Sequence, residues 1–173
     1  FCLMVDEAHS LGVLGERGRG LAESAGVEDA VDFVVGTFSK SLGSIGGYCV
    51  SNRPELEAIR FSIRSYIFTA SSSPAVIAST RVALRLLQER PQLRARLWQN
   101  AERLYTGLKQ LGFTLGPQAS PVVAVRIEDR ETALRWWPQL LEQGIYVNLV
   151  VPPASPSAFS LLRCSVSAAH SDE

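Results

Sequence analysis

Two short loops in this sequence contain side chains that can do chemistry together. The first contains Asp6 and His9, and the second contains Thr37 and Lys40. A lysine amine can form a Schiff base with an aldehyde, and a carboxylate can hold a proton on a pyridine nitrogen. Hydroxyls with nearby backbone amides can bind a phosphate, and a histidine can donate or accept a hydrogen bond near neutral pH. Together these groups meet the requirements of a pyridoxal phosphate site.

The segments before these loops are expected to position them. Residues 1–5 and residues 31–38 are apolar and β-branched, which predicts two buried strands. Ligands of α/β sheets bind beyond the carboxyl ends of the strands, so loops at neighbouring strand ends can face one site. Gly43, Gly46 and Gly47 would let the backbone approach a ligand closely.

Each of these residues also has a structural interpretation. A lysine in a polar loop is usually solvated, and an Asp-Glu pair after a strand usually forms a turn or caps a helix. A single histidine such as His9 is more often structural than catalytic. The glycine that precedes the lysine of a nucleotide-binding phosphate loop is absent before Lys40. The residues alone therefore predict an α/β enzyme site and leave its chemistry open.

The remaining pattern indicates a second, smaller unit. Ser73 and Pro74 form a helix start, and Gly112 is placed to end a long amphipathic helix. The break near Pro91 divides the chain into residues 1–90 and 91–173. Helices are predicted over 55–64, from Ser73 onward, 93–111 and 131–143, and strands over 48–51, 122–127, 146–151 and 161–166.

Composition excludes several classes of protein. Hydrophobic residues make up 46% of the chain and charged residues 20%, which suits a folded core. The 17 basic residues balance the 17 acidic ones, so no nucleic-acid partner is expected. The cysteines Cys2, Cys49 and Cys164 are scattered in apolar contexts, which predicts buried side chains in a reducing cytoplasmic compartment and no metal site. Both ends have the pattern of interior segments, so a fragment of a longer chain is expected.

Seven segments together resemble one enzyme family. The combination is similar to the α-oxoamine synthases, which are fold-type I pyridoxal phosphate enzymes. The resemblance implies an α/β fold in which residues 1–90 are the C-terminal part of a large mixed-sheet domain. Residues 91–173 would then be most of a small α+β C-terminal domain. The matching segments are 6–10, 15–20, 36–41, 66–71, 146–148, 152–156 and 161–165.

The resemblance implies a role for each residue of the first two loops. Lys40 matches the lysine that forms the Schiff base and then removes the α-proton of the amino acid. Asp6 matches the aspartate on the pyridine nitrogen of the cofactor. His9 matches the histidine near the cofactor's phenolic oxygen, and Thr37 matches a ligand of its phosphate.

Two further residues receive roles from the resemblance alone. Thr69 matches a residue that reaches the phosphate from a partner subunit, which implies a homodimer with a shared active site. Arg163 matches the arginine that binds the amino-acid carboxylate, a task that suits a planar guanidinium. Residues 152–156 match a mobile loop at the substrate entrance. The serine-using branch carries an arginine just before this loop, whereas this sequence has Val151.

The implied reaction is a decarboxylating condensation of an amino acid, with L-serine favoured, and a long-chain acyl-CoA. Its products would be a 3-keto amine, CoA and CO₂, and only the lipid product would associate the protein peripherally with a membrane. One alternative is a branch that uses alanine or glycine, such as 8-amino-7-oxononanoate synthesis. An alternative of another class is a non-catalytic partner subunit, although such subunits typically lack the lysine that is present here as Lys40.

Overall fold

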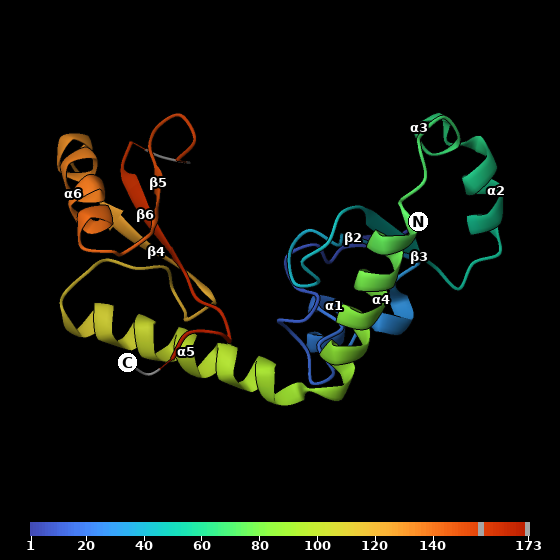
Figure 1. The fold of residues 1–173 in the computed structure, drawn as a ribbon, viewed down its shortest axis with the longest axis horizontal. Coiled ribbons are helices and arrows are strands. Elements are labelled where there is room, and N and C mark those ends of the chain that lie inside the picture. Colours follow the sequence, from blue (N-terminus) through green and yellow to red (C-terminus); the bar gives the residue numbers. More distant parts are fainter. Residues whose placement is uncertain (156–157, 172–173) are drawn as a thin grey trace. The chain divides into compact units, whose positions relative to one another are not determined.

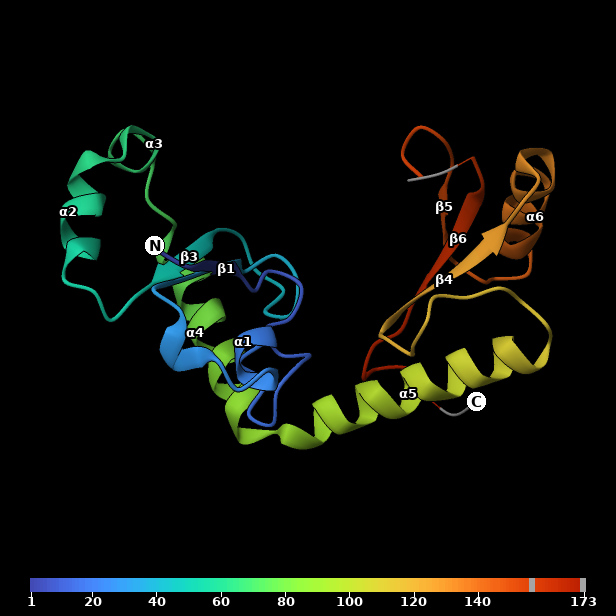
Figure 2. The same cartoon turned by 180° about the vertical axis from the view of Figure 1, so that it is seen from behind.

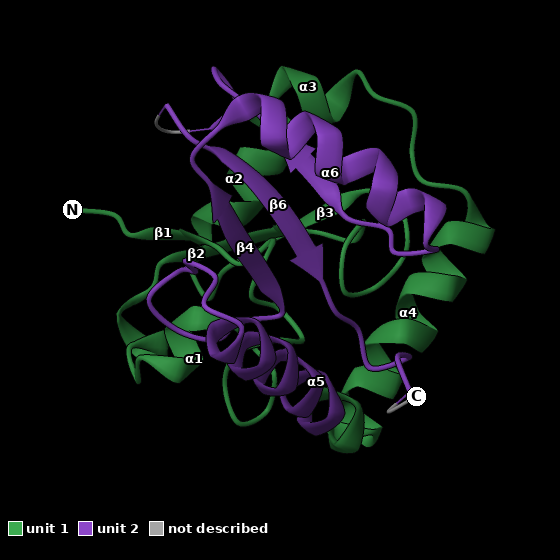
Figure 3. Ribbon diagram, turned by 90° about the vertical axis from the view of Figure 1, so that its left-hand side faces the viewer, with its two compact units in different colours: residues 1–94 green, residues 95–173 purple. Residues whose placement is uncertain are grey.

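The structure is a computed structural model that describes residues 1–155 and 158–171. It divides into two compact units, Phe1–Arg94 and Ala95–Glu173, which Figure 3 shows in different colours. Each unit has a three-stranded sheet of its own. No helix in the described part of the chain is long and apolar enough to cross a membrane.

The sheet of the first unit is mixed. Strands β1 (Met4–Asp6) and β2 (Phe33–Thr37) pair in parallel, and β3 (Gly47–Val50) pairs with β2 in the antiparallel direction. The order is therefore β1-β2-β3, with β2 in the centre. The mixed sheet that the sequence led us to expect for this part of the chain is confirmed.

The prediction of a buried strand over residues 1–5 is wrong in extent and in burial. The strand is Met4–Asp6, and Met4 is 64% exposed while Leu3 is 46% exposed. An apolar run shows that side chains are suited to burial, but burial also needs a covering layer. The described residues do not supply that layer over β1. Strand β2 is likewise only half-buried along its length.

The helices of the first unit follow local sequence signals. Ser73 accepts a hydrogen bond from Val76 N at 3.4 Å and so caps α4, with Pro74 in the first turn as predicted. The single helix predicted over 55–64 is instead two helices, because Ile63 is extended between them. In Figures 1 and 2, α2 and α3 stand away from the sheet. The helices are α1 (Leu21–Ser24), a 3₁₀ turn (Glu28–Ala30), α2 (Glu55–Ser62), α3 (Arg64–Ile67) and α4 (Pro74–Glu89).

Helix α5 (Pro91–Gln110) begins two residues earlier than predicted. Proline at the start of a helix forfeits no hydrogen bond, because the first N–H groups of a helix have no partner within it. Pro91 therefore opens this helix as well as ending the previous one. Gly112 follows the last turn with a φ of 86°, as expected for a glycine that ends a helix.

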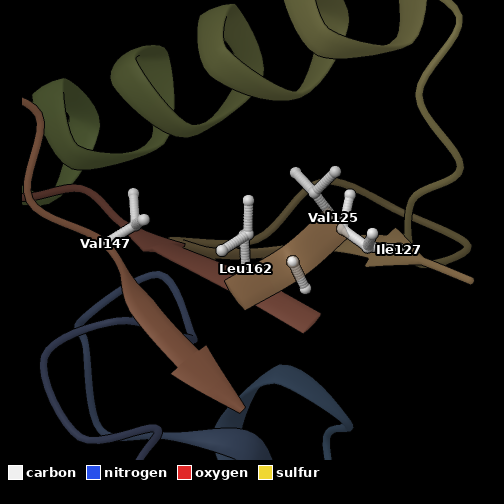
Figure 4. Packing of buried hydrophobic residues seen from close by; sticks show 5 residues of the cluster. Val125, Ile127, Val147 and Leu162 are labelled. Atoms are coloured by element: carbon white, nitrogen blue, oxygen red, sulfur yellow. The ribbon is translucent and has the colours of Figure 1, made fainter. Parts of the chain in front are cut away.

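The second unit is a small α+β structure with its own core. Its sheet has the order β4-β6-β5 and is antiparallel throughout, and α6 packs against all three strands. Figure 4 shows four aliphatic side chains on the same side of this sheet: Val125, Ile127, Val147 and Leu162. The remaining elements are β4 (Val122–Ile127), α6 (Arg130–Glu142), β5 (Asn148–Val150) and β6 (Ser160–Ser165).

Candidate active site

Asp6 and Thr37 end neighbouring strands and lie on the same face of the sheet. The parallel register pairs Asp6 with Val35, and Thr37 follows two residues later on the same strand. Because side chains alternate along a strand, these three side chains point to one side. Parallel strands end at the same edge, so the loops that carry His9 and Lys40 leave the sheet together. The prediction that the two loops start at neighbouring strand ends is confirmed.

The two loops also contact each other beyond the sheet. Glu7 N donates to Val35 O over 2.8 Å, which extends the pairing of β1 and β2 by one residue. Farther along the chain, a Cβ placed on Gly12 would lie 3.1 Å from the Cβ of Ser41. His9 lies between these two fixed points, and its side chain is exposed. The first loop is therefore held to strand β2 at Glu7 and lies against the second loop at Gly12.

Lys40 lies at the exposed tip of the loop between β2 and β3. The base of this loop is closed by hydrogen bonds from Phe38 N to Gly46 O at 2.9 Å and from Ser44 N to Phe38 O at 2.8 Å. Leu42 is only 6% exposed and anchors the loop in the interior. The Lys40 amine thus extends into solvent from a backbone that is fixed at its base.

The chain has few amines that could compete with Lys40. Lys40 and Lys109 are its only lysines. Lys109 lies on α5, and its Nζ is 5.8 Å from the centre of the Tyr105 ring, a cation–π contact within the helix. Lys40 is therefore the lysine of this chain that lies in the loop after a strand of the first sheet.

A pair of hydroxyls lies at the start of the same loop. Thr37 Oγ1 and Ser39 Oγ are 2.8 Å apart, and Ser39 N donates to Thr37 Oγ1 at 3.2 Å. Thr37 Oγ1 also donates to Gly46 O at 3.1 Å. These bonds fix both hydroxyls beside exposed backbone, which is a donor set suited to a phosphate group. Sequence reasoning identified Thr37 but missed Ser39, although a hydroxyl two residues farther on was a visible signal.

Tyr48 was also missed, and it carries the clearest electrostatic effect near the site. Its ring packs over Gly36, on the face opposite Asp6, and stacks on Phe38 with 5.7 Å between ring centres. Burial raises the pKa of the Tyr48 phenol, and the negative charges of Glu7 and Asp6 raise it further. The phenol therefore stays protonated at neutral pH beside the end of β1.

Glu7 caps a helix, a role that the sequence suggested only in general for an Asp-Glu pair after a strand. Its side chain is 1% exposed, and its carboxylate accepts hydrogen bonds from Leu21 N at 2.7 Å and Ala22 N at 2.8 Å. It therefore caps α1, which begins after Gly20 and so has no side-chain cap of its own. A helix that starts at glycine was the signal that an acceptor had to come from elsewhere in the chain.

Thr69 is not joined to Asp6, His9, Thr37 or Lys40 by any hydrogen bond or ion pair within the described part of the first unit. Thr69 follows α3 in a segment, residues 61–75, where every side chain is exposed. Arg163 lies on β6 of the second unit, is exposed, and pairs with Ala124 and Asn148 across the sheet. Of the six predicted site residues, Asp6 and Thr37 therefore lie on one face of the sheet, and His9 and Lys40 lie in the loops that follow these two strands.

The expected entrance loop begins as a tight turn. Val151 is half-buried, and its carbonyl accepts hydrogen bonds from Ala154 N at 2.9 Å and Ser155 N at 3.2 Å. The peptide bond between Pro152 and Pro153 is cis. The last residue of the predicted loop, Pro156, lies outside the described residues.

The groups at this sheet edge match those of pyridoxal phosphate in kind. A carboxylate on Asp6 suits a ring nitrogen, an amine on Lys40 suits an aldehyde, and the hydroxyls of Thr37 and Ser39 suit a phosphate. The Asp6, Lys40 and Ser39 side chains are exposed, so they are accessible to a ligand. The residues present therefore fit this cofactor.

Comparisons with known proteins agree with this chemistry. The family model described as aminotransferase class I and II matches residues 1–173. A curated serine palmitoyltransferase from Caulobacter vibrioides (strain NA1000 / CB15N) is 60% identical over 171 residues, which cover 99% of this chain and 42% of that protein. A curated 8-amino-7-oxononanoate synthase from Trichlorobacter lovleyi is 40% identical over 173 residues, which cover 99% of this chain and 44% of that protein.

A solved structure shares the fold. It is described as a high-resolution structure of SPT with PLP internal aldimine, and it superimposes with a TM-score of 0.95 at 50% sequence identity. The match covers 99% of this chain and 44% of that one. The predicted α/β fold is confirmed by this likeness. The chain spans less than half the length of the relatives that it matches.

Proposed function

This chain belongs to the aminotransferase class I and II family, and on that basis we propose that the whole protein is a pyridoxal-phosphate-dependent acyltransferase. It condenses L-serine with a long-chain acyl-CoA and releases CoA and CO₂ to give a 3-keto amine. The observation that carries this proposal is the 60% identity with a curated serine palmitoyltransferase over almost the whole chain. The local geometry around Lys40 supports it.

Four residues of the first unit would hold the cofactor and move the proton. When bound, pyridoxal phosphate supplies an electron sink for negative charge at the Cα of the amino acid. Asp6 would hold a proton on the ring nitrogen, and Thr37 would bind the phosphate. The Lys40 amine would hold the aldehyde carbon and later take the α-proton at Nζ. His9 would donate a hydrogen bond to the phenolic oxygen or to the substrate.

The remaining binding roles involve the second unit and a partner subunit. Arg163 would bind the substrate carboxylate through two parallel hydrogen bonds. Thr69 would reach the phosphate bound by a second subunit, which makes the active form a homodimer. We assign residues 1–90 to the large domain and residues 91–173 to the small one. The protein would act in the cytoplasm and meet the membrane only through its lipid product. The predicted burial of the cysteines does not support this location, because it is wrong for Cys2 and Cys49, which are exposed.

The choice of amino acid rests on similarity. The relative named 8-amino-7-oxononanoate synthase is 40% identical, against 60% for the relative named serine palmitoyltransferase. Serine is therefore favoured over alanine and glycine, although Val151 replaces an arginine of that branch. A panel of serine, alanine and glycine, scored by release of the CoA thiol with full-length protein, decides between them. Preferential use of alanine would contradict the assignment of serine as the substrate.

The two lysines of the chain give a matched test of the catalytic proposal. In the full-length protein, borohydride reduction should fix the cofactor on the peptide that contains Lys40, as seen by mass spectrometry. Lys40→Ala should remove this label and lower turnover by about 100-fold or more, because both the covalent link and the base are lost. Lys109→Ala should leave label and turnover unchanged. Full function of Lys40→Ala in cells would instead support the non-catalytic subunit hypothesis.

A further inference from the structure

Glu7 is a fully buried carboxylate for which the proposed reaction has no role. Its side chain is 1% exposed, and within the described residues it has no ion pair with lysine or arginine. Three hydrogen bonds compensate for its burial. Its Oε2 accepts from the Ser10 hydroxyl and from Leu21 N at 2.7 Å, and its Oε1 accepts from Ala22 N at 2.8 Å.

The surroundings of this carboxylate are shaped to hold it in one position. Gly20 has a φ of 122°, a backbone conformation that other residues rarely adopt. A Cβ at Gly20 would lie 2.2 Å from Oε2 of Glu7, so a side chain there would displace the carboxylate. The start of α1 thus accommodates the Glu7 carboxylate in two ways: its N–H groups donate hydrogen bonds to the carboxylate, and Gly20 has no side chain that would displace it.

The backbone of Glu7 also makes hydrogen bonds that fix the residues before and after it. Its N–H donates to Val35 O at 2.8 Å, which fixes the end of the strand just after Asp6. Its carbonyl accepts from Ser10 N at 3.1 Å, so the turn that contains His9 is closed on Glu7. The Ser10 hydroxyl donates to the carboxylate of the same residue. Both ends of the His9 turn therefore depend on Glu7.

We propose that Glu7 is a positioning residue that fixes Asp6 and His9 relative to the cofactor. The inference rests on the proposed function for the identity of that cofactor. The carboxylate ties the turn between these two residues to the first turn of α1, fourteen and fifteen residues along the chain. Without this tie, Asp6 and His9 would keep their chemical groups but would no longer be held where they could bind the cofactor.

Glu7→Gln tests this proposal with little change in size. Three donors approach the two oxygens, so either orientation of the amide places an NH₂ group against a donor. Glu23→Gln is the matched control. Glu23 also holds part of the first loop, by accepting from Arg17 N at 3.0 Å and Arg19 N at 2.8 Å, but it does not contact the His9 turn.

The first readout is hydrogen exchange in the full-length apoprotein. The Ser10 and Leu11 amides, which donate to Glu7 O, should exchange on the order of tenfold faster in Glu7→Gln. In Glu23→Gln, faster exchange should be confined to residues 17–19. Wild-type exchange at Ser10 and Leu11 in Glu7→Gln would overturn the proposal, whether or not the protein takes up cofactor.

The second readout is the bound cofactor itself. In Glu7→Gln, the pH midpoint of cofactor absorbance should move and the dissociation constant for the cofactor should rise by roughly tenfold. A residue that only stabilised the fold would leave the midpoint in place, so an unchanged midpoint contradicts positioning. Failure of the wild-type protein to bind the cofactor would count against the proposed function instead. The exchange result would still show whether Glu7 stabilises the turn that contains His9.

A second pair of variants keeps Glu7 in place and covers the case in which Glu7→Gln does not fold. Gly20→Ala should displace the carboxylate and reproduce faster exchange at Ser10 and Leu11. Gly26→Ala is its control, because Gly26 also has a positive φ, of 68°, but has open space around it. Equal exchange at Ser10 and Leu11 in these two variants would overturn the proposal.

Discussion

Tyr48 lies where the negative charges of Asp6 and Glu7 act on its phenol. Burial and these two charges raise its pKa above the ordinary value of about 10. The folded state therefore holds the phenol proton more tightly than the unfolded chain does. The resulting stability is complete below about pH 10 and is lost as the pH rises through the folded pKa.

Tyr48→Phe should remove this dependence on pH. In full-length protein, the midpoint of denaturant unfolding should fall above about pH 10 in the wild type and fall less steeply in the variant. Tyr146→Phe is the control, because Tyr146 is 75% exposed, and its curve should follow the wild type. Parallel curves for Tyr48→Phe and the wild type would show that the phenol has no such coupling to folding.

The site residues differ in how visible they are in the sequence. Asp6 and Lys40 could be proposed as site residues because each follows a strand-like run, and strand ends are where α/β sheets bind ligands. Glu7 and Tyr48 could not be found in this way. The burial of Glu7 depends on N–H groups fourteen and fifteen residues later, and Tyr48 depends on the register that places it over Gly36. Such long-range contacts leave no local pattern.

At the scale of elements, the β2–β3 ladder carries both Thr37 and the base of the Lys40 loop. Two glycines allow its strands to approach. A Cβ on Gly36 would lie 2.5 Å from the Tyr48 hydroxyl, and a Cβ on Gly47 would lie 2.8 Å from Gly36 O. The first clash involves a side chain that can move, whereas the second involves backbone of the neighbouring strand.

We expect alanine at these glycines to destabilise the protein unequally. Gly36→Ala should lower the free energy of unfolding by about 1–3 kcal/mol, as for other over-packed sites. Gly47→Ala should cost more, because the strands themselves must separate. Gly107→Ala, in the middle of α5 with open space around it, should instead stabilise by about 0.5–1 kcal/mol. Denaturant midpoints of the full-length variants measure this order.

A double variant tests whether Gly36→Ala destabilises the protein by displacing the Tyr48 ring. If Gly36→Ala acts by displacing Tyr48, then Tyr48→Ala should remove most of its cost, and the two changes should not be additive. Additive changes in unfolding free energy would mean that the clash with the ring is not what destabilises Gly36→Ala.

The elements were predictable to the extent that their signals are local. Local signals placed α5 and α6 within about two residues, placed the start of α4 at Ser73 and Pro74, and gave β4 its observed bounds. The break at Ile63 between α2 and α3 was not predictable, because its flanking residues continue a helical pattern. Strand β1 was placed too early, because the apolar run before Met4 has the composition of a strand, whereas the ladder with β2 begins only at the pair of Met4 and Phe33.

At the scale of the whole molecule, buried apolar side chains are unevenly shared. The second unit has a compact cluster that includes Val125, Ile127, Val147 and Leu162. Helices α2 and α3 of the first unit have no buried residue, and Phe61 and Phe68 are 77% and 79% exposed. Exposed aromatic residues of this size are typical of surfaces that another part of an assembly covers. This distribution predicts where the 173-residue chain is weakest.

In the 173-residue chain alone, we expect amides of β4 and β6 to exchange slowest and those of α2 and α3 to exchange fastest. Opening of α2 and α3 exposes little additional apolar surface, so its free energy is small, whereas opening of the second sheet exposes the Leu162 cluster. In the full-length dimer that we propose, the same α2 and α3 amides should become protected. Hydrogen exchange of residues 55–67 in both proteins measures this difference. Equally fast exchange in both would mean that nothing covers Phe61 and Phe68, and it would count against the proposed place of Thr69 at a subunit interface.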